Sequence, residues 1–181
     1  EKGAGRYDLY FMTGLPTQTK ESIMQTVDFC EELYETLGWD KRFMPFVSPM
    51  APFIDPGSRA FENPDEFGYV ITRKTLSEHI EAITRPSWKY ILNYESKFLS
   101  RDDMVEATYD CAIGLNALKG RAGSISKKSM KENEERIMSA KRIMSEIDKI
   151  VAGDKDWMHS KDFENLKDKA MKYSLSTVCD K

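Results

Sequence analysis

Histidine and cysteine are the side chains most able to support catalysis or bind a metal, and this sequence has few of them. The two histidines, His79 and His159, have no partner at the spacing of a metal site, so we expect structural or surface roles for both. Cys30 and Cys111 fall on apolar stripes of predicted helices, where a thiol is usually a core residue, and Cys179 lies in the C-terminal tail. No metal site is therefore predicted, and no residue is assigned a catalytic role.

Two further patterns have simple structural explanations. Asp102, Asp103 and Glu106 follow Ser100 at the start of a predicted helix, where the positive end of the helix dipole favours carboxylates. The segment Gly14-Leu15-Pro16 lacks the glycine spacing and the Lys-Ser/Thr pair of a phosphate-binding loop. Neither pattern alone predicts a reaction.

The elements that would position a site begin with a βαβ unit. Residues 7–13 form an apolar run almost without alternation, which is typical of a strand covered on both faces in a parallel sheet. Residues 43–48 predict a second strand, and we expect the two to be parallel neighbours with a right-handed crossover. The helix between them, residues 19–37, has an apolar face formed by Ile23, Val27, Cys30, Tyr34 and Leu37.

The carboxyl ends of these strands are the predicted ligand edge, because parallel α/β folds bind ligands there. They are Thr13-Gly14-Leu15-Pro16 and Pro49-Met50-Ala51-Pro52. A segment rich in proline and aromatic residues, 45–64, follows and could form a roof over this edge, although a plain packing loop explains it equally well. The polar side chains of the roof are Asp55, Ser58, Arg59 and Glu62.

The rest of the chain is predicted to be helical. A short helix has Leu76, Ile80 and Ile83 on its apolar face, and an aromatic stretch follows over residues 88–98. Longer helices are expected over residues 100–120 and 126–152, and a last one after Ser160 faces inward through Phe163, Leu166, Ala170 and Tyr173. We predict three segments: a βαβ unit with its loop (1–70), a helical extension (71–122) and C-terminal helices (123–181).

Charge and composition exclude several classes of function. The 181 residues include 27 basic and 30 acidic side chains, a net charge of −3, so no bulk basic surface for nucleic acid is expected. No apolar run is long enough to cross a membrane. Three widely separated cysteines are not a disulfide framework, and they favour the reducing cytoplasm.

Two parallel strands cannot complete a sheet, and no third strand is evident downstream. Either another chain supplies the neighbours, for example in a homodimer, or the sequence is part of a longer protein. We favour the second interpretation, because the chain starts almost directly at a buried-type strand.

Several segments resemble radical S-adenosylmethionine (radical SAM) enzymes, and most of all the subgroup with a cobalamin-binding domain. Residues 9–19 are similar to the fifth barrel strand and its turn, except that Thr17 stands where a glycine is expected. Residues 48–58 are similar to the segment after the sixth strand. Shorter matches extend the resemblance to about residue 120: Phe61-Glu62-Asn63-Pro64, Glu78-His79, Pro86-Ser87-Trp88-Lys89-Tyr90, Leu92-Asn93-Tyr94-Glu95, Ser100-Arg101-Asp102 and Ala107-Thr108-Tyr109.

The resemblance implies the end of a partial parallel, TIM-like barrel in an enzyme that uses S-adenosylmethionine, a [4Fe–4S] cluster and cobalamin. The CxxxCxxC cluster motif of such enzymes does not occur here, so the chain would be a C-terminal portion, inactive alone, whose partners are the first half of the barrel and the cobalamin domain. By this match Thr13, Gly14, Leu15 and Pro16 would lie near the adenosyl group. Substrate contacts would come from Asp55, Ser58 and Glu62.

A second interpretation belongs to another class of function. The chain could be a non-catalytic helical interaction module built around residues 126–152, in which Met130, Ile137, Met144 and Val151 recur every seven residues. An exposed apolar stripe on the helix of residues 126–152 would favour the interaction module.

Overall fold

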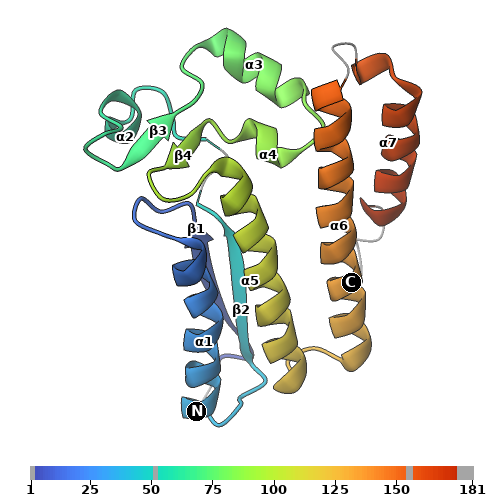
Figure 1. Ribbon diagram of the computed structural model, residues 1–181. Coiled ribbons are helices and arrows are strands. Elements are labelled where there is room, and N and C mark those ends of the chain that lie inside the picture. Colours follow the sequence, from blue (N-terminus) through green and yellow to red (C-terminus); the bar gives the residue numbers. More distant parts are fainter. Residues whose placement is uncertain (1–2, 51–52, 154–156, 175–181) are drawn as a thin grey trace. The chain divides into compact units, whose positions relative to one another are not determined.

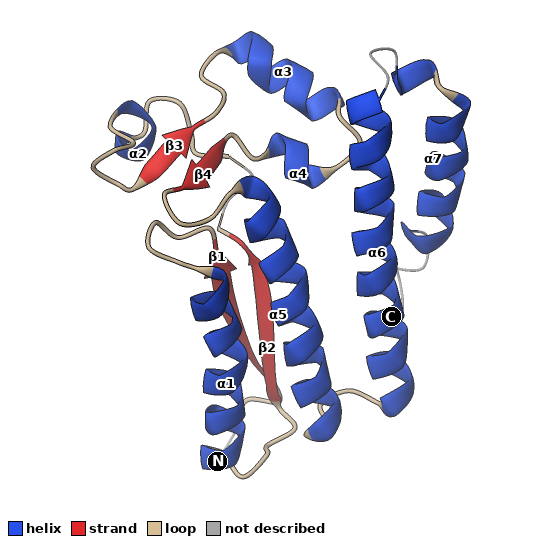
Figure 2. Ribbon diagram, viewed as in Figure 1, coloured by secondary structure: helices blue, strands red, loops and turns tan. Residues whose placement is uncertain are grey.

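The computed structural model describes residues 3–50, 53–153 and 157–174, with backbone alone for residues 167 and 169–174. It is a mixed α/β structure in which helices predominate (Figures 1 and 2). The described strands form two separate two-stranded sheets and no barrel. The chain divides into two compact units, residues 1–134 and 135–181, and both of the first two predicted segments belong to the first unit.

The predicted βαβ unit is confirmed. Strand β1 (Tyr7–Thr13) pairs in parallel with β2 (Phe43–Pro49), with Tyr7 opposite Phe43 and Thr13 opposite Pro49. Helix α1 (Lys20–Thr36) connects them. Its first turn is fixed by a capping box, in which the Thr19 and Ser22 side chains each accept a hydrogen bond from the other residue's backbone N–H.

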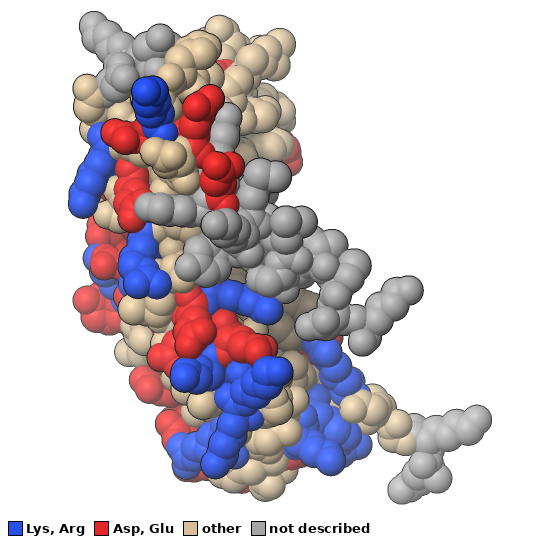
Figure 3. All heavy atoms as spheres, turned by 90° about the vertical axis from the view of Figure 1, so that its right-hand side faces the viewer, with Lys and Arg blue, Asp and Glu red and all other residues tan. Residues whose placement is uncertain are grey.

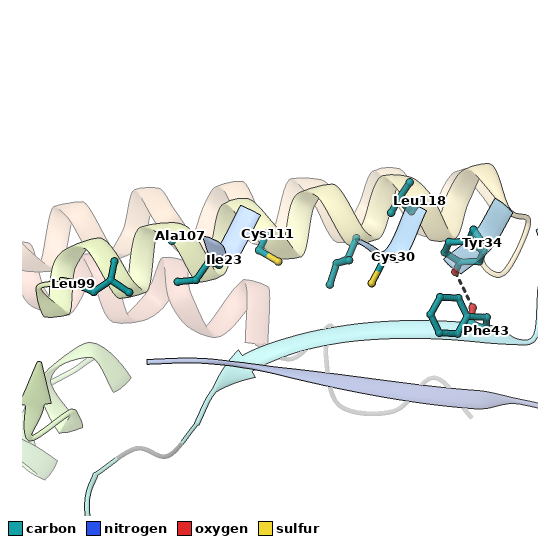
Figure 4. Close-up of a cluster of buried hydrophobic side chains, with 9 residues drawn as sticks. Ile23, Cys30, Tyr34, Phe43, Leu99, Ala107, Cys111 and Leu118 are labelled. Atoms are coloured by element: carbon teal, nitrogen blue, oxygen red, sulfur yellow. Dashed lines mark hydrogen bonds between the residues drawn. The ribbon is translucent and has the colours of Figure 1, made fainter. Parts of the chain in front are cut away.

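Helices α1 and α5 (Arg101–Arg121) both lie on one face of the β1–β2 sheet (Figure 4). The main core fills the space between the two helices and the sheet. The helix predicted over residues 100–120 is confirmed, and one of its faces is buried through Met104, Thr108, Cys111, Leu115 and Leu118. One residue of the α1 face is wrongly predicted: Leu37 is 51% exposed, because α1 ends at Thr36 and the chain turns away at Gly38. The buried core residues are Ile23, Cys30, Tyr34, Phe43, Leu99, Ala107, Cys111, Leu115 and Leu118.

Helices α1 and α5 approach closely and are joined by ion pairs at both ends. Gly114 lies against Val27, where an added Cβ would be 2.7 Å from a Val27 methyl carbon. The Lys20 ammonium pairs with Asp103 at 2.8 Å and with Glu106 at 2.7 Å. These contacts account for Asp103 and Glu106 more specifically than the helix dipole does, and Asp102 pairs with the Lys89 ammonium at 2.9 Å. At the other end Arg121 pairs with Glu31.

A second sheet is present that was not expected from the sequence. Strands β3 (Tyr69–Ile71) and β4 (Tyr94–Ser96) pair antiparallel. Each has only three residues, too few for a periodic pattern to be recognised. Around this sheet lie three helices: α2 (Arg59–Glu62), α3 (Leu76–Thr84) and α4 (Trp88–Ile91).

The short helix predicted near residue 80 is present, but its apolar face is wrongly predicted. Leu76, Ile80 and Ile83 are 78%, 56% and 65% exposed, whereas Ala82 is buried. Helix α3 therefore packs through its smaller side chains and leaves its largest apolar side chains in solvent.

The C-terminal part contains α6 (Lys127–Gly153), the short 3-10 helix η1 (Trp157–His159) and α7 (Lys161–Ser174). Within the first unit, α6 is joined to α5, because the Asn116 amide donates to the Met130 carbonyl oxygen at 2.8 Å. Within the second unit, the rings of Trp157 and Phe163 lie 4.9 Å apart in an edge-to-face contact. Phe163 and Leu166 are buried as predicted, while the side chains of Ala170 and Tyr173 lie outside the described set.

None of the helices over the described residues combines the length and apolar character that a membrane span requires.

Candidate functional site

The carboxyl ends of β1 and β2 meet at one edge of their sheet. The Met50 backbone N–H donates to the Thr13 carbonyl oxygen at 2.8 Å, which extends the strand ladder beyond Pro49. We call Thr13, Gly14, Leu15 and Pro16 the edge turn. Ala51 and Pro52, also predicted at this edge, lie outside the described residues.

The Thr13 side chain is used inside the protein. It is 1% exposed, and its hydroxyl oxygen lies 2.7 Å from that of Thr108 on α5. The Thr108 hydroxyl donates to the Met104 carbonyl oxygen, also at 2.7 Å. Because a hydroxyl has one proton to donate, Thr13 is the donor to Thr108. The chain of hydrogen bonds ties the end of β1 to the first turns of α5.

Gly14 is buried under the second sheet. Its φ of +87° is a conformation that favours glycine, and an added Cβ would lie 2.7 Å from the Tyr94 hydroxyl oxygen and 2.9 Å from the Met104 sulfur. The Tyr69 hydroxyl donates to the Gly14 carbonyl oxygen at 3.2 Å. Burial raises the pKa of Tyr69, so this phenol remains a donor at neutral pH.

The other half of the edge turn is more accessible. Leu15 is 36% exposed and Pro16 is partly buried, with its ring against Gly68. The Gln18 side chain braces the turn, because it accepts from the Leu15 N–H at 3.0 Å and donates to the Met12 carbonyl oxygen at 2.9 Å. A ligand at this edge would therefore meet Leu15 and Pro16, while Thr13 and Gly14 support them from beneath.

The three predicted substrate contacts lie around α2. Ser58 caps this helix, since its hydroxyl accepts from the Phe61 N–H at 3.2 Å. The Glu62 carboxylate accepts from the Gly57 N–H at 3.1 Å. Asp55 is exposed, and its carbonyl oxygen accepts from the Ser58 N–H. Among the described residues no hydrogen bond joins these three to the edge turn, and two of the three side chains hold the local loop structure.

Asn93 holds the loop at Ile54, a role not evident from the sequence. The fully buried Asn93 amide accepts from the Ile54 N–H at 2.8 Å and donates to the Ile54 carbonyl oxygen at 3.0 Å. The same amide nitrogen lies 3.0 Å from Nε2 of His79, whose Nδ1 lies 2.7 Å from the Thr75 carbonyl oxygen. His79 therefore has the structural role that its isolation in the sequence predicted.

The sheet face opposite α1 and α5 carries apolar side chains, and two cationic groups contact one of them. Tyr10 and Met12 are 65% and 51% exposed, and the Tyr10 ring stacks on that of Phe46 at 5.3 Å. The Lys119 ammonium lies 4.5 Å from the centre of the Phe46 ring, and the Arg6 guanidinium lies 5.7 Å from it. Burial and the nearby charge of Arg6 lower the pKa of Lys119.

No group of three or more potential metal-ligating side chains converges within the described part of the chain. The Cys30 and Cys111 thiols are fully buried in the core. Burial raises the pKa of Cys30 to about 12 and that of Cys111 to about 11, so neither is a thiolate at neutral pH. Cys179 lies outside the described residues. With no third ligating side chain beside them in the described part of the chain, Cys30 and Cys111 alone do not supply the three or four ligands of an iron–sulfur cluster.

Basic and acidic side chains are interspersed over the face that Figure 3 shows.

Comparisons with protein-family models, with curated proteins and with solved structures found no match for this chain.

Proposed function

We propose that this chain forms the C-terminal part of a radical SAM enzyme, in which β1 and β2 are late strands of a partial parallel barrel. The enzyme would reductively cleave S-adenosylmethionine at a [4Fe–4S] cluster, and cobalamin would carry a methyl group. The cluster would be held by another part of that enzyme, because this chain contains no CxxxCxxC motif, and the cobalamin would be held by its cobalamin-binding domain. The chain alone would be inactive.

The observation that supports this proposal best is the asymmetry of the β1–β2 sheet. Helices α1 and α5 cover one face (Figure 4). The opposite face presents Tyr10, Met12 and Phe46. A parallel sheet is normally covered on both faces. In a barrel the inner face is covered by the other strands and by the bound ligands, which would account for apolar side chains here.

The edge turn would then lie at the mouth of the barrel. Leu15 and Pro16 are the residues we propose to contact the adenosyl group, and Thr13 and Gly14 would set their position through Thr108 and Tyr69. Asp55, Ser58 and Glu62 remain proposals for substrate contacts, made by the exposed side of the loop around α2.

The decisive experiment is to read the coding sequence upstream of Glu1. We expect a CxxxCxxC motif there, and the longer protein should form a cluster after anaerobic incubation with iron and sulfide and release 5′-deoxyadenosine from S-adenosylmethionine. A complete reading frame without that motif would refute the proposal. The 181-residue chain is the matched control, and it should take up no stoichiometric iron.

A helical interaction module remains the second candidate, and α3 is the element that favours it. Leu76, Ile80 and Ile83 form an exposed apolar stripe on α3. On α6, where an exposed apolar stripe would have favoured this candidate, Met144 and Ile147 are buried. Polar substitutions on α3 that abolish binding of a partner without changing stability would support this candidate.

A further inference from the structure

A chain of hydrogen bonds runs from α3 through a buried asparagine to the loop after β2. His79 lies on α3, and Asn93 lies between α4 and β4 (Figure 1). The Nδ1 atom of His79 lies 2.7 Å from the Thr75 carbonyl oxygen, and its Nε2 atom lies 3.0 Å from the Asn93 amide nitrogen. The Asn93 amide binds both backbone groups of Ile54 in the loop. The rings of His79 and Phe53 also meet edge to face at 6.3 Å, so two adjacent loop residues are held through His79.

The backbone of Ile54 fixes the orientation of the Asn93 amide. The amide oxygen accepts from the Ile54 N–H at 2.8 Å, and the amide nitrogen donates to the Ile54 carbonyl oxygen at 3.0 Å. The reversed orientation would place donor against donor and acceptor against acceptor. The second hydrogen of the amide nitrogen is therefore the one directed at His79. Because Asn93 is fully buried, this hydrogen depends on His79 for its acceptor.

The two partners of His79 also determine which ring nitrogen carries the proton. The Thr75 carbonyl oxygen can only accept, so Nδ1 is the protonated nitrogen of the neutral ring. Nε2 then has a free lone pair, which accepts the hydrogen bond from Asn93. A second proton would occupy this lone pair and set an N–H of the ring against an N–H of Asn93 across 3.0 Å. Neutral His79 therefore completes the chain of hydrogen bonds, and the imidazolium form breaks it.

No charged side chain of the described residues ties the loop to a protonated His79. The charged side chains of the elements that meet here are Glu78 and Glu81 on α3, Arg85 at its end, Arg73 before it, Asp55 in the loop, Lys89 on α4 and Glu95 on β4. Glu78 interacts electrostatically with His79, but both lie on α3, so this interaction is the same whether the loop is held or released. Asp55 is exposed and forms no ion pair with any described residue.

We propose that His79 is a pH-sensitive switch, which holds the loop at Phe53 and Ile54 when it is neutral and releases the loop when it is protonated. Histidine is the side chain that ordinarily changes charge near neutral pH. In the protonated form either the His79 ring leaves Asn93, or the Asn93 amide turns and loses both bonds to Ile54. Buried polar groups lose partners in either case, so the loop opens more often. This switch does not depend on the proposed radical SAM function.

Hydrogen exchange of the Ile54 amide in the 181-residue chain tests the proposal. NMR at about pH 7.5 and about pH 5.5, on either side of the usual titration of histidine, gives its protection factor, which is the intrinsic exchange rate divided by the measured rate. This factor should fall about tenfold in mild acid, the loss expected when one buried hydrogen bond is broken. The amide of Cys30, in the core helix α1, is the internal reference and should keep its protection factor. The ring nitrogen shifts of His79 at neutral pH should show a proton on Nδ1 and none on Nε2.

His79→Gln is the decisive variant, because glutamine does not titrate in this range. The protection factor of Ile54 should then be independent of pH. His159→Gln is the matched control, since His159 is the other histidine of the chain and belongs to the second unit. This control variant should keep the tenfold fall, on the order of one broken hydrogen bond.

Three results would overturn the switch. The first is an Ile54 protection factor that does not fall relative to that of Cys30, and the second is an equal fall in His79→Gln. The third is a neutral His79 ring that carries its proton on Nε2. Circular dichroism checks the fold of both variants. If His79→Gln does not fold, the ring nitrogen shifts and the two amides of the unchanged chain decide the result.

Discussion

Replacing Gly14 by alanine should destabilise the first unit through two separable effects. A Cβ on a residue with φ of +87° costs about 1–2 kcal/mol in backbone strain. The same Cβ would lie 2.7 Å from the Tyr94 hydroxyl oxygen and 2.9 Å from the Met104 sulfur, and both side chains are fully buried. Crowding of this kind costs about 1–3 kcal/mol more, so we expect a total loss of about 2–5 kcal/mol.

Gly38→Ala is the control that isolates the backbone effect. Gly38 has φ of +62°, and no atom lies within 4 Å of its added Cβ, so this variant should lose only the strain, about 1–2 kcal/mol. Urea unfolding followed by tryptophan fluorescence measures both losses. A Trp157→Phe background restricts the signal to Trp39 and Trp88, which belong to the first unit.

The reasoning is refuted if Gly14→Ala costs no more than Gly38→Ala. A double mutant sharpens the test, because Met104→Ala removes one of the two side chains that crowd the added Cβ. The combined loss should be smaller than the sum of the single losses by at least about 0.5 kcal/mol, the range of coupling for residues in contact.

Three further outcomes are expected. Hydrogen bonds from the backbone N–H groups of Thr75 and Lys74 lower the pKa of Glu78 to about 2, from 4.5. The Glu78 carboxylate therefore adds to the free energy of unfolding, relative to the Glu78→Gln variant, above pH 4.5. This difference should disappear as the pH falls toward 2, which urea titrations of both proteins at each pH would measure. Cys30 and Cys111, whose pKa values are raised to about 12 and about 11, should resist a thiol reagent at pH 8 and react once urea unfolds the chain, as peptide mapping would show. Thr13→Val and Thr108→Val should each lower the free energy of unfolding by about 1–3 kcal/mol, because each leaves a buried hydroxyl with one partner fewer. The double variant should lose clearly less than the sum of the two single losses. Full additivity would show that the two hydroxyls do not interact.

The sequence predicted the elements whose patterns are long. Strands β1 and β2 and helices α1, α5 and α6 each extend over seven or more residues, so a period or an apolar run could be recognised. Strands β3 and β4 could not be predicted, because three residues contain no period. The face of α3 was wrongly predicted for a different reason. Its orientation depends on His79, which binds Asn93 from a distant segment, and not on the amphipathic pattern of α3 itself.

The position of the edge turn was predictable, but its environment was not. Strand polarity alone brings the carboxyl ends of β1 and β2 together. The partners that bury Thr13 and Gly14 lie far along the chain, because Thr108 is 95 residues from Thr13 and Tyr69 is 55 residues from Gly14. No local pattern encodes contacts of that range.

The double hydrogen bond between Asn93 and the backbone of Ile54 acts as a reversible cross-link across 39 residues. It divides the long segment between β2 and β3 into two shorter loops, whose ends are already held together. Since the entropy lost on closing a loop grows with its length, this tether lowers the cost of ordering each part. The tether also determines the order in which the region opens: the Ile54 amide should exchange its proton with solvent only when Asn93 is released, and therefore together with the second sheet rather than with the surface loop in which it lies.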